Sequence, residues 1–591
     1  MRSSTAALVA ALALAMGGAG CMGEDDEEPR KARDAKAPAD APNIVVIQSD
    51  DQSLESMRVM SKTKRLLGDR GATFENHFAN WPLCCPSRAT QLTGQYAHNH
   101  GVLGNSPPEG SYLRLPRHDN IAVWLKEAGY EVGHIGKFLN GYGPKKDDPE
   151  TPANDVTEVP RGWSDWRTGS AGTTYGYYDY VQNEWSEEDG KSRDGELSEY
   201  GGGVGDFKTD ANTADALDLI GKYADGDAPF YLQVDYLAPH TGGPNRPANT
   251  PHPPYDCRGF AKAAPRDANV YDDAPLAARQ DPSFNEADVG DKPPDVAGLP
   301  RLSPRKVDQI TAGYRCELES MLSVDDGVAN IVRRLEATGE LENTYVFYMG
   351  DNGFLRGEHR LDTGKNIVYE PAIRIPLLLR GPGVPAGVEV RDLTSNADFA
   401  TTVMALTGAA FDEGSPPDGR SLLPALEHPA DETGRELLIE SNGYAAIRTQ
   451  RYKWVEHEDG FVELYDLKSD PNEERNVAGE SAYEEVQGKL VTRLQDLRDC
   501  AAAECTRTPD LQIEPRGPDD ACVVELGGPD LPEVESLTVR VGADLTGRDE
   551  SEPFASTVAP HELPRSGQVT ASATLIDGRR VTRQLSLRTC R

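Results

Sequence analysis

The run Cys84–Arg88 (CCPSR) places a reactive side chain where a helix is predicted to begin. Pro86 suits the first helical turn, because its fixed φ and its missing N–H carry no penalty there, and Gly94 offers a stop. Cys84 would then lie among the free backbone N–H groups at the positive end of the helix, with Arg88 one turn further on. The residues alone leave two interpretations: an anion-binding site with a reactive group at its mouth, or a pair of ordinary buried thiols.

Two apolar runs end in side chains that carry oxygen ligands. Residues 43–49 (NIVVIQS) and 344–349 (TYVFYM) are predicted to be buried strands of a parallel sheet. Ligands in α/β folds bind at the carboxyl ends of such strands. The side chains that follow are Asp50, Asp51, Asp351 and Asn352. Oxygen ligands without thiolates suit a hard cation, with calcium favoured over magnesium where most ligands come from the protein; the alternative is a pair of solvated turns.

Three further residues stand in short motifs outside these runs. Lys137 follows Gly136 at the end of a predicted helix and strand (119–140), and Lys365 follows Gly364. His240 ends the motif Ala-Pro-His after a predicted strand at 229–237. A lone lysine is most often a surface residue, whereas a histidine at a strand end is a candidate acid.

The run CCPSRATQLTGQYAHNHGV, together with these motifs, resembles the sulfatase family, in particular its N-acetylglucosamine-6-sulfatase and extracellular heparan endosulfatase branch. The resemblance implies that a formylglycine-generating enzyme oxidises Cys84 to Cα-formylglycine, whose hydrated aldehyde is the nucleophile. It also implies one calcium ion. Its ligands would be Asp50, Asp51, Asp351, Asn352 and the modified residue at Cys84.

The same resemblance assigns roles to the cationic side chains. Arg88, Lys137 and Lys365 would bind sulfate, and His240 would protonate the leaving oxygen or bind sulfate. One motif departs from the wider family: many sulfatases continue G-K-W-H, and that histidine helps to release sulfate, whereas this chain continues with Phe138, Leu139 and Asn140. An amide cannot act as a base, so the sequence does not supply the proton acceptor.

Aromatic residues extend the resemblance toward carbohydrate substrates. The segment 159–166 (VPRGWSDW) is similar to the glucosamine-6-sulfatase branch, and a tyrosine-rich run to Tyr180 follows it. Such clusters either pack in a core or stack on sugars. We therefore predict a sulfuric ester hydrolase acting on sulfated carbohydrate, of the N-acetylglucosamine-6-sulfate or glycosaminoglycan type. The alternatives are a phosphodiesterase or phosphonate hydrolase of the same superfamily, and a non-catalytic surface binding lipoprotein.

Composition and the first residues predict where the protein acts. The formal charge of −36 excludes a nucleic-acid partner, and a sulfated substrate requires basic groups gathered at one site. Residues 1–20 have the pattern of an export signal, Cys21 follows small residues as in bacterial lipoproteins, and residues 21–41 are predicted to be a disordered tether. We expect an exported protein whose only membrane contact is a lipid at Cys21, with simple secretion as the alternative.

Six of the nine cysteines remain for disulfide bonds once Cys21, Cys84 and Cys85 are set aside. Locality favours Cys500–Cys505 and Cys522–Cys590 and leaves Cys257–Cys316, although six cysteines allow fifteen connectivities.

The predicted fold is an α/β/α sandwich with a large central mixed sheet. We expect a catalytic domain at 42–383, a smaller α+β subdomain at 384–505, and an immunoglobulin-like β-sandwich module at 506–591, where short alternating strands flank Asp577-Gly578. Helices are predicted at 208–224, at 398–407 and from Pro304 to about residue 337, the last with a break near Gly327. Residues 444–454 and 462–467 are predicted to form a strand pair, and the stretch 241–303 an irregular insertion or substrate-covering loop.

Overall fold

The computed structural model describes most of the chain from residue 41 onward. The described residues are 37, 41–144, 156–188, 192–243, 257, 259–509, 511–516, 522–527, 530, 533–541, 544–551, 554–558 and 568–586. The predicted signal peptide, Cys21, nearly all of the tether and Cys590 lie outside them, and so therefore does the predicted Cys522–Cys590 bond. Within the described part, no helix combines the length and the apolar character needed to cross a membrane.

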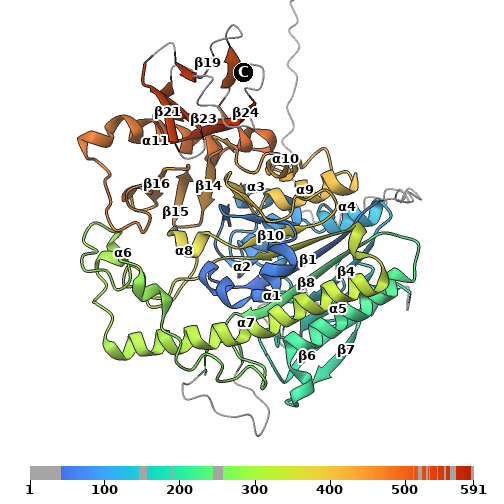
Figure 1. Ribbon diagram of the computed structural model, residues 1–591. Helices are drawn as coiled ribbons and strands as arrows, with labels where there is room; N and C mark the ends of the chain where they lie inside the picture. Colours follow the sequence, from blue (N-terminus) through green and yellow to red (C-terminus); the bar gives the residue numbers. More distant parts are fainter. Residues whose placement is uncertain are drawn as a thin grey trace, which may run out of the picture.

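A mixed sheet of ten strands forms the centre of the molecule (Figure 1). Its strands, in spatial order, are β11 (Val388–Val390), β2 (Ala72–Phe74), β10 (Leu377–Arg380), β9 (Thr344–Gly350), β1 (Asn43–Asp50), β8 (Phe230–Pro239), β4 (Glu131–Gly136), β5 (Asp165–Ser170), β6 (Tyr180–Ser186) and β7 (Glu196–Tyr200). The central strands β9, β1, β8, β4 and β5 are parallel to one another. The predicted α/β fold class is thereby confirmed.

Helices cover both faces of this sheet. One face carries α2 (Cys84–Thr93), α4 (Ile121–Glu127) and α9 (Asp398–Thr407); the other carries α1 (Ser61–Thr63), α5 (Lys208–Ala224) and α7 (Pro304–Thr338). Ile44 and Val46 pack into the first layer, while Val45 and Ile47 pack into the second. Because β1 is buried on both sides, its sequence is a continuous apolar run and does not alternate.

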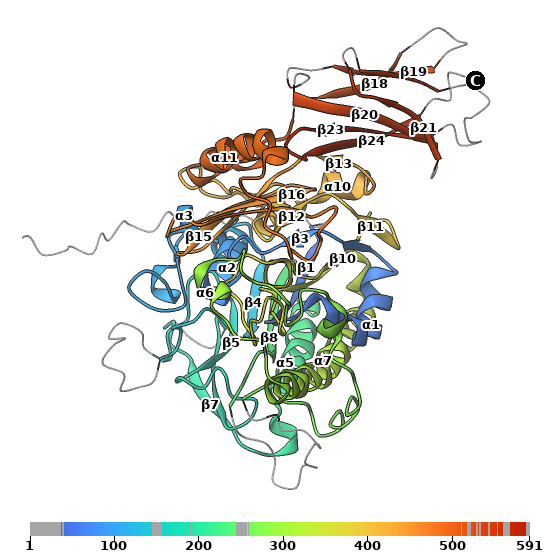
Figure 2. The ribbon, with the colours of Figure 1, turned by 90° about the vertical axis from the view of Figure 1, so that its left-hand side faces the viewer.

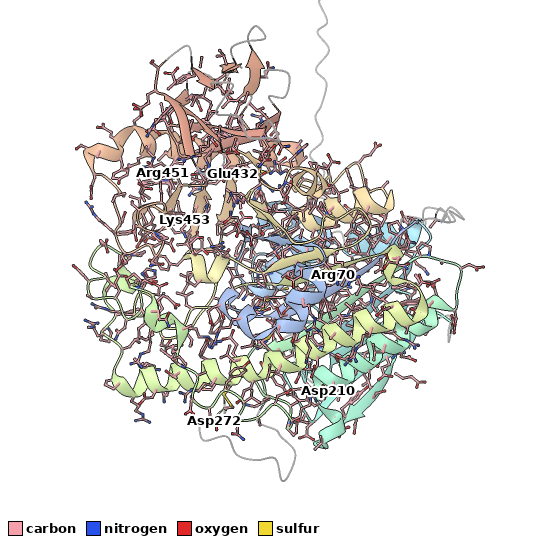
Figure 3. The ribbon with its side chains drawn as sticks, viewed as in Figure 1. Arg70, Asp210, Asp272, Glu432, Arg451 and Lys453 are labelled. Atoms are coloured by element: carbon pink, nitrogen blue, oxygen red, sulfur yellow. A yellow bond between two sulfur atoms is a disulfide. The ribbon has the colours of Figure 1, made fainter. Side chains whose placement is uncertain are left out.

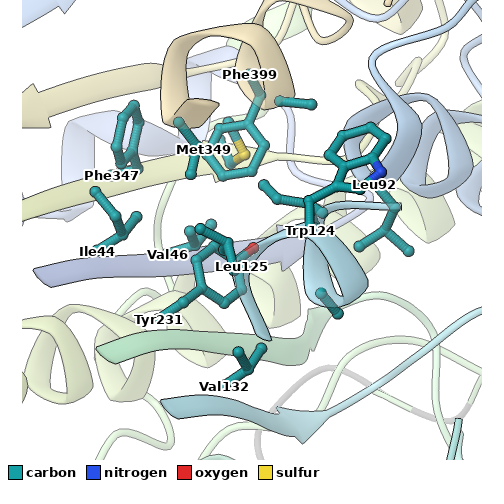
Figure 4. Packing of buried hydrophobic residues seen from close by; sticks show 14 of the residues in the cluster. Ile44, Val46, Leu92, Trp124, Leu125, Val132, Tyr231, Phe347, Met349 and Phe399 are labelled. Atoms are coloured by element: carbon teal, nitrogen blue, oxygen red, sulfur yellow. The ribbon is translucent and has the colours of Figure 1, made fainter. Parts of the chain in front are cut away.

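Figure 4 shows the first layer from close by. Side chains of the sheet, among them Ile44, Val46 and Phe347, meet Leu92 of α2 and Phe399 of α9 there. The packing anchors α2 against the middle of the sheet, and this fixes where the first residue of α2 lies.

Helix α7 begins as predicted but has no break. Ser303 caps it by accepting a hydrogen bond from the Lys306 N–H, and Pro304 occupies the first turn. Gly327 lies within the helix, where an added Cβ would come within 2.3 Å of the Tyr236 hydroxyl on β8. The glycine therefore permits close approach of helix and sheet, and the predicted break there is wrong.

The described part of the insertion has little regular structure, with a 3₁₀ turn at η5 (Ala277–Gln280) and one short helix, α6 (Pro294–Ala297). The predicted disulfide Cys257–Cys316 attaches this insertion to α7, and the predicted Cys500–Cys505 bond is also present.

A four-stranded antiparallel sheet, partly covered by α11 (Glu484–Arg498), follows the large sheet. Its strands are β14 (Leu437–Glu440), β15 (Tyr444–Arg448), β16 (Tyr452–His457) and β17 (Val462–Asp466). The predicted single strand at 444–454 is wrong: the chain reverses after Arg448, where Thr449 Oγ1 accepts the N–H of Tyr452 at 3.0 Å. The remaining short elements are β3 (His77–Phe78), α3 (Ala97–His100), α8 (Glu370–Ile373), β12 (Thr394–Ser395) and α10 (Leu423–Glu427).

The C-terminal module consists of two antiparallel sheets that share an apolar core. One contains β13 (Glu432–Thr433), β24 (Arg580–Ser586), β23 (Gln568–Leu575), β20 (Val534–Val541) and β21 (Asp544–Asp549); the other contains β18 (Gln512–Arg516), β19 (Cys522–Gly527) and β22 (Ala555–Val558). Figure 2 shows the module at the end of the molecule, beyond α11. Strand β13 joins it from the preceding subdomain, and Glu432, labelled in Figure 3, pairs there with Arg580.

Candidate active site

The two acidic strand ends adjoin because β1 and β9 are parallel neighbours. Ser49 lies beside Gly350 in the register, so the residues after each strand meet at one edge of the sheet. The Asn352 side-chain amide donates to Asp51 Oδ1 at 2.7 Å, and the Asp51 N–H donates to Asp351 Oδ1 at 3.1 Å. Asp51 has φ of 63°, a sharp turn that brings its carboxylate back toward the strand ends.

Cys84 is the first residue of α2 and points into the same place. Leu83 is the extended cap before it, and Gly94, at φ 71°, ends the helix as predicted. The Cys84 thiol donates to Asp50 Oδ1 at 3.4 Å and lies 4.0 Å from Asp51 Oδ1. Burial and the Asp50 carboxylate raise the pKa of this thiol to about 12, so the unmodified side chain is protonated at neutral pH.

Arg88 joins three strand ends from one turn further along α2. Its Nε donates to Asp351 Oδ2 at 3.0 Å, one terminal nitrogen donates to the Lys137 carbonyl at 2.9 Å, and that nitrogen also lies 3.2 Å from Asp235 Oδ2 on β8. The other terminal nitrogen is 3.9 Å from Asp50 Oδ2 and makes no hydrogen bond to any described residue. A buried guanidinium thus keeps one donor free beside the acids.

Two lysines complete the cluster. Lys137 follows β4 and contacts Asp50 Oδ2; Lys365 contacts Asp51 Oδ1, and its Nζ is 2.6 Å from Cys84 Sγ. Burial alone would raise the pKa of Asp50, but Lys137 and the other nearby cations hold it below its usual value. Burial opposes the charge on Lys365 as well, yet the adjacent carboxylates raise its pKa. Asp50 and Lys365 are therefore both held in their charged forms.

His240 lies at the open side of this cluster. It follows β8 with its ring partly exposed, and Nε2 is 3.5 Å from Asp51 Oδ2. Its other ring nitrogen is 2.5 Å from the Thr241 carbonyl oxygen, and the ring packs against Tyr175 at 4.7 Å between centroids. His240 and Lys365 are thus the two partly exposed side chains of this cluster.

The residues present fit a hard divalent cation. Ligand atoms of Asp50, Asp51, Cys84 and His240 lie within 4.8 Å of one another. The Asn352 Oδ1 atom is buried and has no hydrogen-bond partner among the described residues, so an oxygen ligand is available beside three carboxylates. Carboxylate and amide oxygens are the ligands that calcium and magnesium take.

The charge of the cluster changes sign when such an ion is added. Four carboxylates contact three cations here; the carboxylates are Asp50, Asp51, Asp235 and Asp351, and the cations are Arg88, Lys137 and Lys365. The acids exceed the cations by one, and a divalent cation would reverse this balance. A pocket that attracts anions is therefore compatible with the acidic charge of the whole chain.

All nine residues selected from the sequence come together at this edge of the sheet. They are Cys84, Arg88, Lys137, His240, Lys365, Asp50, Asp51, Asp351 and Asn352. Asp235 was not predicted from the sequence. Its Oδ2 atom lies 3.2 Å from a terminal nitrogen of Arg88 and 3.2 Å from Nε2 of the buried His134 ring. Its signal was a carboxylate inside the mostly apolar run of β8.

Comparisons with known proteins agree with this geometry. The family model described as sulfatase matches residues 42–409. The chain belongs to the sulfatase family. A sulfatase hydrolyses sulfuric esters, so the predicted enzyme class is confirmed. A second family model, the C-terminal region of N-sulphoglucosamine sulphohydrolase, matches residues 357–500.

The chain is also similar to individual sulfatases. The human N-acetylglucosamine-6-sulfatase is 30% identical over 517 residues, covering 79% of this sulfatase and 86% of the relative. A putative extracellular sulfatase of Caenorhabditis elegans is 31% identical over 64% of this chain and 48% of its own length. The solved structure of BT4656 in complex with its substrate D-glucosamine-2-N,6-O-disulfate has a TM-score of 0.56 at 24% identity, covering 78% of this chain and 97% of that one, and it supports the fold.

Proposed function

We propose that this protein is an exported sulfatase that removes sulfate from sulfated amino sugars, of the N-acetylglucosamine-6-sulfate or glycosaminoglycan type. Support for the sugar comes from relatives whose names specify N-acetylglucosamine-6-sulfate. Support for export comes from the signal-like residues 1–20 and from relatives described as extracellular. A lipid at Cys21 would hold the protein at the membrane surface.

The single observation that carries the proposal is the convergence of Cys84 with three carboxylates and three cations. A formylglycine-generating enzyme would convert Cys84 to the aldehyde, and one hydroxyl of its hydrate would attack sulfur. The bond from sulfur to the sugar oxygen then breaks as the new bond forms. Loss of a proton from the second hydroxyl reforms the aldehyde and expels sulfate, and water restores the hydrate.

The remaining residues have roles that follow from their positions. Arg88, Lys137 and Lys365 would face the sulfate oxygens and stabilise charge that develops there. His240 would give a proton to the departing sugar oxygen, since its ring lies on the open side of the acids.

The oxygens of Asp50, Asp51, Asp351 and Asn352, with the modified Cys84, would hold a calcium ion. When bound, this ion would supply positive charge for the sulfate and polarise the aldehyde hydrate.

Replacement of Cys84 by alanine tests the proposal. The wild-type protein, produced together with a formylglycine-generating enzyme, is expected to hydrolyse N-acetylglucosamine-6-sulfate and 4-nitrophenyl sulfate much faster than a phosphodiester or a phosphonate monoester. Cys84→Ala should abolish both sulfatase activities without lowering the melting temperature, and Cys85→Ala, which changes the neighbouring thiol, should retain them. Sulfatase activity in Cys84→Ala, or a preference for the phosphorus esters, would overturn the proposal.

A further inference from the structure

A loop from the sheet rim grips the segment that carries His240. This loop joins β5 to β6, and the Tyr175 carbonyl accepts the N–H of Gly243 at 2.7 Å. The Tyr177 hydroxyl donates to the His240 carbonyl at 2.9 Å. A Cβ added at Gly242 would come within 2.4 Å of the Tyr177 ring, so the two segments are packed as closely as glycine allows. The backbone around His240 is therefore held by the loop between β5 and β6.

The side chain of Tyr175 contacts two residues of the site and a third beside it. Its ring lies 4.7 Å from the His240 ring, at an angle of 37° between the planes. The Lys137 Nζ lies 4.8 Å from the centre of the same ring. The tyrosine hydroxyl accepts a hydrogen bond from the Asn140 side-chain amide at 2.7 Å. One half-buried side chain thus connects the ends of β4 and β8.

These contacts restrict the side chains that Tyr175 touches. An aromatic face attracts the ammonium of Lys137, and ring packing limits the rotation of the His240 imidazole. Because His240 itself is partly exposed, the other contacts of its ring are few: Asp51 on one nitrogen and the Thr241 carbonyl on the other. Loss of the Tyr175 ring would therefore leave the imidazole held by these two polar contacts alone.

Asn140 has a consistent place in this arrangement. It lies three residues after Lys137, and its side-chain amide donates to the hydroxyl of Tyr175. The position thus serves to anchor an aromatic side chain in this protein.

We propose that Tyr175 is a positioning residue that orients His240 toward the leaving oxygen. The inference rests on the proposed function, because it assigns the proton of the departing alcohol to His240. It goes beyond that function because protonation of the departing sugar oxygen would depend on Tyr175, a residue that does not itself bind sulfate.

The test uses two substrates that differ in their need for a proton. A sugar 6-sulfate releases an alkoxide, which requires protonation, whereas 4-nitrophenyl sulfate releases a stable phenolate. Tyr175→Leu should lower kcat on N-acetylglucosamine-6-sulfate by about 100-fold, within the usual range for loss of a general acid, and on 4-nitrophenyl sulfate by less than about tenfold. Tyr175→Phe keeps the ring and should restore kcat on the sugar to within about fivefold of wild type.

Tyr200→Leu is the matched control, since Tyr200 stacks on Tyr180 at the rim of the sheet, at 4.6 Å, and touches no residue of the site among the described contacts. Equal losses on both substrates in Tyr175→Leu, or no loss on either, would overturn the inference and assign the ring to packing alone. Activity in Cys84→Ala would instead overturn the proposed function, so the two failures are distinguishable.

Discussion

Asp398 and the acids of the active site are equally buried, but their hydrogen bonds are completed in different ways. At the start of α9, Asp398 and Arg435 form an ion pair with no exposed side-chain surface. Asp398 Oδ1 accepts from Arg435 at 2.8 Å and from the Arg420 N–H at 2.9 Å, while Oδ2 accepts from Arg435 at 2.5 Å and from the Ser395 N–H at 2.9 Å. Two donors reach each carboxylate oxygen, so the acid of this pair has no lone pair left for a metal ion.

The active site leaves donors and acceptors unused. The Asn352 Oδ1 atom and one terminal nitrogen of Arg88 have no hydrogen-bond partner in the described chain. Asp50 and Asp51 are paired with Lys137 and Lys365. Lysine side chains are flexible, so these two ammonium groups can move from the carboxylates toward an incoming anion. Arg435 Nε also lacks a partner in the described chain, so an unused donor does not distinguish the two clusters. The comparison indicates that unused acceptor atoms, here Asn352 Oδ1 and Asp235 Oδ1, separate a cluster that can bind a cation from a structural one.

Removal of Lys365 should give the largest effect on catalysis. Lys365→Met deletes a cation beside Asp51 and Cys84, and we expect kcat/KM on an aryl sulfate to fall about 10³-fold, about 4 kcal/mol of transition-state stabilisation. Lys306→Met, which removes an exposed lysine paired with Asp362, should leave kcat/KM within twofold. A loss below tenfold in Lys365→Met would contradict the role of this lysine.

Removal of Asp398 should act on stability instead. Asp398→Ala leaves the Arg435 guanidinium buried without its acid, and we expect the free energy of unfolding to fall by about 3–5 kcal/mol. Denaturant titration followed by circular dichroism would measure it, and the kcat of the folded fraction should remain that of wild type. An unchanged midpoint, or a kcat loss as large as that of Lys365→Met, would erase the distinction between the two clusters.

A smaller effect is expected from a third polar contact, at His98. Its two ring nitrogens lie 3.0 Å from Glu440 Oε2 and 3.0 Å from the Cys500 carbonyl oxygen, and both partners accept, so the ring donates twice and is charged. Burial lowers the pKa of His98, but the hydrogen bond and charge of Glu440 raise it to about 9. A raised pKa stabilises the fold fully below the unfolded value of about 6.5, and this contribution is lost as pH rises through 9.

The shift alone corresponds to at most about 3 kcal/mol between pH 6.5 and 9.5. Because the pair is partly exposed and screened by solvent, we expect a change of about 1 kcal/mol in the free energy of unfolding. Denaturant titrations of wild type and His98→Gln over that interval would measure it, because only wild type should show the added slope. Parallel pH profiles would show that the ring is not charged in the folded protein.

The sequence predicted the parts of the site that lie at the ends of regular elements. Asp50 and Asp351 end continuous apolar runs, and Cys84 precedes a proline in a first helical turn, so pattern and position agreed. Asp235 and Tyr175 were not identified. Asp235 acts through Arg88, a residue distant in sequence, and Tyr175 is one of several tyrosines in a run where only the folded loop decides which ring reaches His240.

Two errors in the fold have the same origin. The glycine at 327 was predicted to interrupt α7, but tertiary contact with Tyr236 requires it inside the helix. The run 444–454 was predicted as one strand, because Thr449 makes its turn through a side-chain hydrogen bond that has little signature in composition. Close approach and side-chain turns depend on neighbours that local patterns do not contain.

Catalysis depends on a chemical change at Cys84, and mass spectrometry of the peptide that contains this residue is the most direct test. The protein should be isolated from cells with an active formylglycine-generating enzyme, digested, and treated with a hydrazide that labels aldehydes. We expect an aldehyde at Cys84, a thiol at Cys85, and sulfatase activity in proportion to the converted fraction. A fully active protein whose Cys84 is entirely thiol would contradict the account.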